Sequence, residues 1–131
     1  MALQFQTLHR AAKPELLNEE WLVLENTGPG LLNSAGWSIE VSRGKGRPRP
    51  LGQLKPGFIL QAGEKVRLIT GTASKKAQGT PPAEDGMKNY FLFLREPVLA
   101  APGIVLHVRL NQHELACATF DPDEATGIAA A

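Results

Sequence analysis

Residues 20–37 read EWLVLENTGPGLLNSAGW, and this stretch decides the fold. It joins an apolar run at 21–24 to a turn at 27–30 that is rich in glycine and proline, and it ends on a second tryptophan. Residues 57–71 have the same construction and read GFILQAGEKVRLITG. Short apolar segments separated by turn residues are typical of an all-β chain.

Further strand-like segments follow the same pattern along the chain. In residues 36–42, Trp37, Ile39 and Val41 alternate with Ser38 and Glu40, as in a strand with one buried face. Apolar residues also mark segments 3–8, 20–26, 59–60, 64–70, 90–94, 104–110 and 115–120. These segments predict about seven or eight strands that bury their apolar faces as a β-sandwich, with Trp37 in the core.

The chain of 131 residues has the size of one domain. We expect the sandwich to occupy 1–120 and the polar, alanine-ended segment 121–131 to be a flexible tail. Segment 71–88 is rich in small and polar residues and is expected to be mobile.

The two decisive stretches together resemble the lamin-tail domain of the bacterial type. The first carries the Glu-Trp-x-x-Leu-x-Asn-Thr-Gly pattern at 20–28 and a Gly-Trp pair at 36–37, and the second matches Gly-Glu-x-Val at 63–66 and Thr-Gly at 70–71. The resemblance implies an immunoglobulin-like β-sandwich. It also implies a module that binds proteins or nucleic acid and has no catalytic activity.

The most distinctive polar feature is the segment RGKGRPRP at 43–50. No acidic residue occurs between 41 and 63, although the net charge of the whole chain is only +1. Because Pro48 and Pro50 lack an N–H group, we expect 43–54 to be a long basic loop. The candidate binding residues are therefore the cations of this region: Arg43, Lys45, Arg47, Arg49 and Lys55. Lys75 and Lys76 would join them if segment 71–88 folds beside the loop.

From these features we predict a binding or scaffold module that is not an enzyme and that contacts a protein partner through the basic loop. A protein that binds nucleic acid with the same loop is the first alternative, although the loop has no aromatic residue on which a base could stack. A structural subunit that self-assembles is the second. We expect a monomer or a weak homo-oligomer.

Other chemistry has little support in the sequence. His9, His107 and His113 lack metal-ligand spacing, so no metal and no cofactor are predicted. We expect His107 to face solvent, His113 to lie in a turn, and Cys117 to be a small core residue on the opposite face from His107.

The cellular compartment of the protein is predicted from three features that the sequence does not show: an intrachain disulfide, a secretory signal and a membrane span. A single cysteine cannot form an intrachain disulfide. Residues 1–10 do not read as a secretory signal, and the most apolar window is too short to span a bilayer. We therefore expect a cytoplasmic protein without a membrane span.

Overall fold

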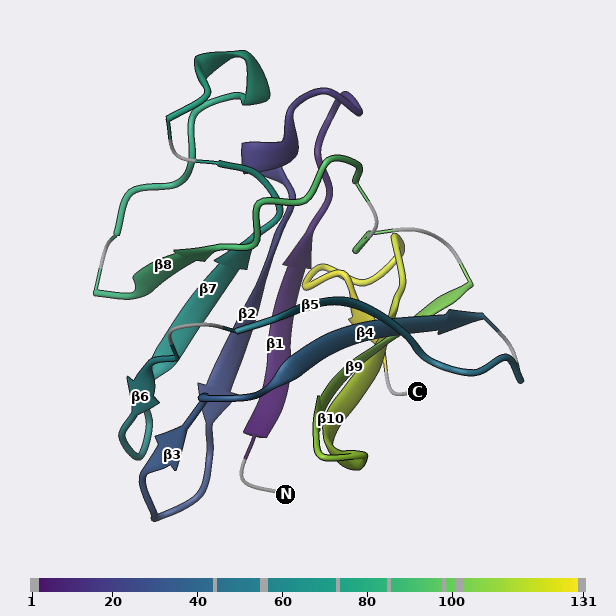
Figure 1. Cartoon of the computed structure of the whole chain (residues 1–131). Helices are drawn as coiled ribbons and strands as arrows, with labels where there is room; N and C mark the ends of the chain where they lie inside the picture. The colour runs from purple at the N-terminus through teal and green to yellow at the C-terminus, as the bar shows by residue number, and fades with distance from the viewer. Residues whose placement is uncertain are drawn as a thin grey trace.

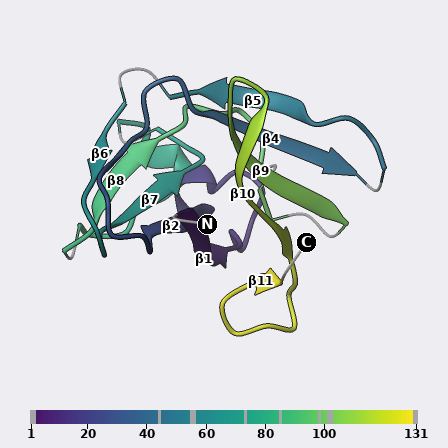
Figure 2. The ribbon, with the colours of Figure 1, turned by 90° about the horizontal axis from the view of Figure 1, so that it is seen from below.

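Two β-sheets pack face to face in the computed structural model, which describes residues 3–43, 45–54, 57–72, 74–84, 86–97, 99–100 and 103–129. One sheet has the order β1-β2-β7-β8 and the other β11-β10-β9-β4-β5 (Figures 1 and 2). All the strand pairs are antiparallel except β7 with β8. The predicted all-β sandwich is confirmed.

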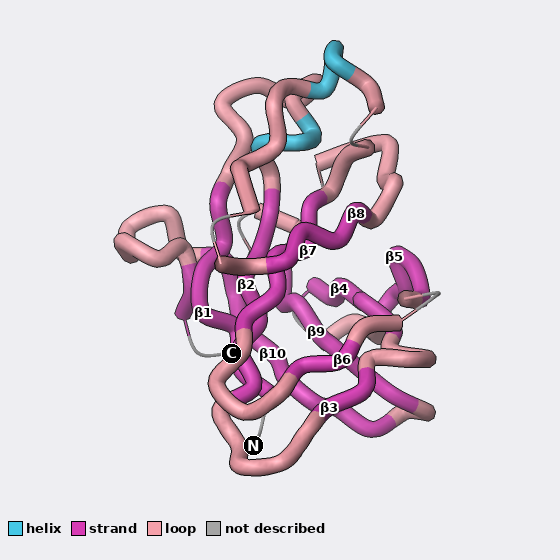
Figure 3. The backbone as a smooth tube through the Cα atoms, turned by 90° about the vertical axis from the view of Figure 1, so that its left-hand side faces the viewer, coloured by secondary structure: helices cyan, strands magenta, loops and turns pink. Residues whose placement is uncertain are grey.

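The strands of the first sheet are β1 (Leu3–His9), β2 (Trp21–Asn26), β7 (Lys65–Ile69) and β8 (Lys88–Phe91). Those of the second are β4 (Ser38–Arg43), β5 (Arg49–Gln53), β9 (Ile104–Leu110), β10 (His113–Phe120) and β11 (Ile128–Ala129). A small ladder pairs β3 (Leu32–Asn33) with β6 (Ile59–Leu60). Two short 3₁₀ helices, η1 (Leu17–Glu19) and η2 (Lys76–Gln78), lie together at one end of the molecule (Figure 3). In the described part of the chain, no helix is long and apolar enough to cross a membrane.

The core forms where the alternating apolar residues of the two sheets meet. Trp37 is only 2% exposed, and its ring packs edge-on against Phe58 with 6.0 Å between centroids. Phe58 makes a similar contact with Tyr90, 5.3 Å away. Aromatic pairs of this geometry add to the gain from burial. Trp37 thus occupies the central position that the sequence predicts for it.

We expected residues 43–54 to form one long loop. This expectation was wrong, because β5 forms within them. Arg49 pairs with Val41 and Pro50 with Glu40, so β4 and β5 make a hairpin. β5 is the outermost strand of its sheet, and a proline is tolerated on an edge strand because one side of that strand needs no donors. The loop is therefore confined to the tip of the hairpin.

The connection between β9 and β10 is also shorter than expected. Asn111 and Gln112 have φ angles of 48° and 70°, the left-handed conformation of a two-residue hairpin turn. β10 consequently begins at His113, which lies in the strand and not in the turn. The expected start at residue 115 was wrong because neither turn residue is glycine, so the turn has no strong signal in the sequence.

The segment expected to be a flexible tail contains β11 in its described part. Ile128 pairs with Phe120 and Ala129 with Thr119. The amide of Leu8 donates to the carbonyl of Thr126 at 2.8 Å, so the same segment contacts β1. The second sheet thus continues beyond residue 120.

Buried polar side chains hold the connections between strands. The fully buried Asn26 donates to the carbonyls of Gly30 at 2.7 Å and Leu60 at 3.0 Å, and it accepts from the amide of Gly28. Ser34 accepts from the amide of Phe58 at 2.7 Å. Buried backbone groups that lack a ladder partner need such substitutes.

We predict that Asn26→Ala lowers the free energy of unfolding by about 3 kcal/mol, because it leaves the buried carbonyl of Leu60 and the partly buried carbonyl of Gly30 without this donor. Asn33→Ala is the matched control. Asn33 also accepts from an amide two residues ahead, that of Ala35, but it is exposed, so its loss should cost only about 0.5 kcal/mol. Urea unfolding measures both values, and equal losses would contradict the role of Asn26.

Candidate functional site

The β4–β5 hairpin brings three of the predicted cationic residues to one cavity. Arg43 ends β4, Arg47 lies at the tip and Arg49 begins β5. All three side chains are exposed, and all three line a cavity of about 480 Å³. In the described ranges, none of them forms an ion pair with a carboxylate. Their positive charges are therefore available to a ligand.

Part of the wall of this cavity is apolar, because the cavity opens from the inner face of the sheet, whereas Ser42, Glu96 and the arginines add polar groups. Val41 pairs with Leu106 in the core, and Arg43 pairs with Ile104. Val41 and Ile104 both line the cavity, and Pro97 adds a further apolar group. Glu96 is the single acidic residue among the lining residues that the structure describes.

The remaining candidate cations that the structure describes are not part of this lining. Lys45 is exposed at the hairpin tip but does not line the cavity. Lys75 and Lys76 lie at η2, at the top of Figure 1, whereas the hairpin points to the right. The structure therefore does not bring the lysine pair to the basic residues. Lys55 lies outside the described residues.

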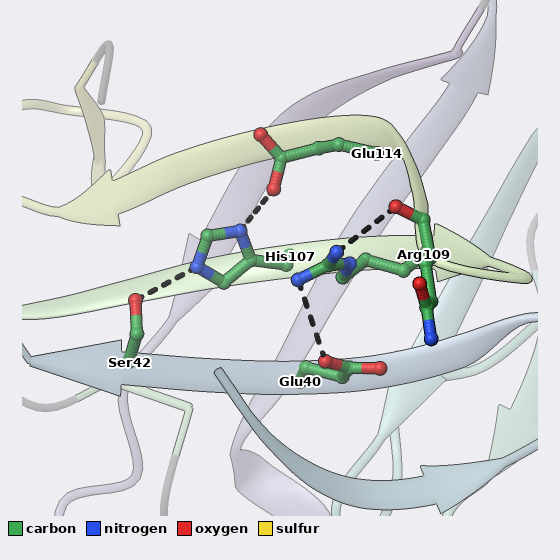
Figure 4. A network of polar contacts seen from close by, with 6 residues as sticks. Glu40, Ser42, His107, Arg109 and Glu114 are labelled. Carbon is green, nitrogen blue, oxygen red and sulfur yellow. Dashed lines mark hydrogen bonds and ion pairs between the residues drawn. The ribbon is translucent and has the colours of Figure 1, made fainter. Parts of the chain in front are cut away.

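A second group of polar side chains covers the outer face of the same sheet (Figure 4). His107 lies between Ser42, whose Oγ is 2.8 Å from Nε2, and Glu114, whose carboxylate contacts Nδ1. Beside it, Arg109 is 4.0 Å from Glu40 and donates to the carbonyl of Gln112 at 2.9 Å. The expectation that His107 faces solvent was wrong: it is 9% exposed, because side chains from β4 and β10 flank it.

The order Ser42–His107–Glu114 is that of the catalytic triads of acyl-transfer enzymes. In the tautomer that donates from Nδ1 to the carboxylate, Nε2 can accept the proton of the serine. However, Ser42 is only 8% exposed. Ser42 is itself among the residues that line the cavity with Val41 and Arg43. Successive side chains of a strand point to opposite faces, however, and the hydroxyl of Ser42 lies 2.8 Å from His107 on the outer face. We interpret the group as a polar link between β4, β9 and β10.

Cys117 lies on this outer face and is exposed, so its expected place in the core was wrong. The reason is a bulge between Glu114 and Ala116, which shifts the alternation of β10 by one residue. Cys117 is therefore paired with His107 on the same face. Although the residue is exposed, its thiol is partly desolvated, which raises the pKa of the Cys117 thiol, and the charge of Glu114 raises that pKa further. A protonated thiol is a poor nucleophile.

Among the residues that the structure describes, no group of three or more histidine, cysteine or acidic side chains could hold a metal ion. The comparisons with known proteins add no family: no protein-family model matches the chain, and no curated protein matches it significantly.

We predict that Glu114→Gln lowers the pKa of Cys117, because it removes a negative charge that opposes the thiolate. Below the pKa of the thiol, alkylation by iodoacetamide should then be roughly two- to tenfold faster than in the wild type. The rate is followed by intact mass at several pH values.

The control is Glu15→Gln, which neutralises an exposed carboxylate elsewhere and should leave the rate unchanged. A Glu114→Gln protein that reacts at the wild-type rate would refute the electrostatic effect of Glu114.

Proposed function

We propose that this chain is a non-enzymatic binding module of the lamin-tail type that contacts an acidic segment of a partner protein through the β4–β5 hairpin. The single observation that carries the proposal is the meeting of Arg43, Arg47 and Arg49, without carboxylate partners among the described residues, at one cavity. Guanidinium groups bind carboxylates with paired hydrogen bonds, so they suit such a partner.

The form of the cavity favours a protein partner over nucleic acid. Its described lining residues include Val41, Ile104 and Pro97 but no aromatic residue on which a base could stack. Glu96 would repel a continuous row of phosphates along the same surface. With a net charge of +1, the chain also has little long-range attraction for a polyanion.

Self-assembly through the nearest sheet edge has less support. β5 is an edge strand, but it contains Pro50 and Gly52 and its pairing with β4 is irregular between Ile39 and Glu40. Proline and bulges are the features by which edge strands avoid pairing with other copies. This supports the proposal of a monomer or a weak homo-oligomer.

The assignment to the lamin-tail type rests on the roles of the residues that carry the resemblance. Glu20 and Asn26 are buried and hold connections between strands, and Trp37 lies in the core. The exposed, single Cys117 suits the cytoplasm, where thiols stay reduced. These observations support a cytoplasmic module of this family as a proposal.

We predict that Arg47→Glu/Arg49→Glu weakens the binding of a fluorescent acidic peptide by roughly tenfold or more, because it reverses the charge that pairs with the carboxylates. Fluorescence anisotropy measures the Kd. Lys75→Glu/Lys76→Glu is the control, since it changes the net charge equally at η2 and should alter the Kd by less than about twofold.

Equal losses of affinity in the two variants would show that the binding depends only on net charge, and this would contradict the proposal. Duplex DNA is titrated in parallel at two salt concentrations. If the DNA binds more tightly than the peptide, with a log–log salt slope of about −3 for three arginines, the nucleic-acid alternative replaces the proposal.

A further inference from the structure

The cavity at the hairpin has two chemically different parts. Its walls at Val41 and Ile104 belong to the apolar inner face of the sheet, and both side chains are buried by more than nine-tenths. Arg43, Arg47 and Arg49 line the same space from the hairpin side and are exposed. A volume of about 480 Å³ lies within the range of cavities that bind small ligands.

We infer that the partner segment inserts one apolar side chain into this cavity and places carboxylates beside it, against the arginines. The inference rests on the proposed function and names the kind of segment that the site takes. An apolar group would release water from the walls of the cavity. By excluding water, it would also strengthen the ion pairs at the entrance.

Each part of the cavity requires its own part of the ligand. A purely acidic segment would leave the wall formed by Val41, Ile104 and Pro97 in contact with water. A purely apolar segment would leave three guanidinium groups without partners beside a dry interface, which is costly. Protein interfaces owe most of their affinity to a few well-packed anchor residues, and the contacts around these anchors mainly exclude water.

Glu96 determines in which orientation the partner segment would bind. It lines the cavity together with the adjacent Pro97, so a carboxylate placed on that side would meet a like charge. The acidic residues of the partner should therefore lie toward the hairpin, and the side of the anchor that faces Glu96 should carry no acid. Glu96→Gln should accordingly tighten the binding of an acidic ligand.

The test uses the full chain and three synthetic peptides of equal length. The first has one phenylalanine beside a run of aspartate and glutamate, the second has alanine in place of the phenylalanine, and the third keeps the phenylalanine but has amides in place of the acids. Fluorescence anisotropy gives each Kd. The first peptide should bind roughly tenfold or more tightly than either of the others.

Two variants check where the anchor lies. Pro97→Asp places a charge on the apolar wall at an exposed position, so it should abolish the preference for phenylalanine over alanine without unfolding the chain. Glu96→Gln should tighten the first peptide by roughly two- to fivefold. Circular dichroism checks whether both variants keep the β-sheet spectrum.

The outcomes separate the inference from the proposed function. If the phenylalanine and alanine peptides bind equally and Arg47→Glu/Arg49→Glu weakens both, the anchor is refuted and the acidic-partner function stands. If no acidic peptide binds, or if the amide peptide binds as tightly as the acidic one, both are refuted. Retention of the phenylalanine preference in Pro97→Asp would also overturn the assigned position of the anchor.

Discussion

The buried carboxylate of Glu20 is the contact on which the arrangement of this sandwich depends. It accepts a hydrogen bond from Thr70 Oγ1 at 2.7 Å and from the amides of Leu99 and Ala100, each at 3.2 Å. Glu20 precedes β2 in one sheet, and the two amides precede β9 in the other. One side chain thus joins the start of β2 to the segment that leads toward the second sheet. A carboxylate with several donors tolerates a burial that would otherwise be very costly.

The same kind of contact links the scaffold to the candidate site. The chain between β8 and β9 contains Glu96 and Pro97, which line the cationic cavity, and it then reaches the amides that Glu20 holds. The opposite side of the cavity is built by the β4–β5 hairpin, which ordinary sheet pairing holds. A buried side chain on one side and a backbone ladder on the other therefore keep the apolar wall and the arginines in register. Such pre-organisation would reduce the entropy cost of the proposed binding.

Sequence patterns predict the layers of this protein well, because alternation reports directly which face of a strand is buried. They predict the hairpin and the outer face less well. Pro50 argues against predicting a strand at 49–53, because proline is tolerated in a strand only at the edge of a sheet. Which strand lies at an edge follows from the topology of the whole sheet. Likewise, the bulge after Glu114 has no local signal, yet it moves Cys117 from the expected core face to the outer face, beside His107. The arginines are evident in the sequence, but the cavity also needs Pro97, whose position depends on distant contacts.

The central claim is that buried polar side chains hold the connections of the sandwich as firmly as ladders hold its strands. Native-state hydrogen exchange, followed residue by residue by NMR, tests it most directly at the amides of Leu99 and Ala100, which donate to Glu20. The claim predicts that these two amides are protected to nearly the same degree as those of β9, and that both lose their protection in Glu20→Ala. Exchange at the rate of an open loop in the wild type, while β9 remains protected, would contradict it.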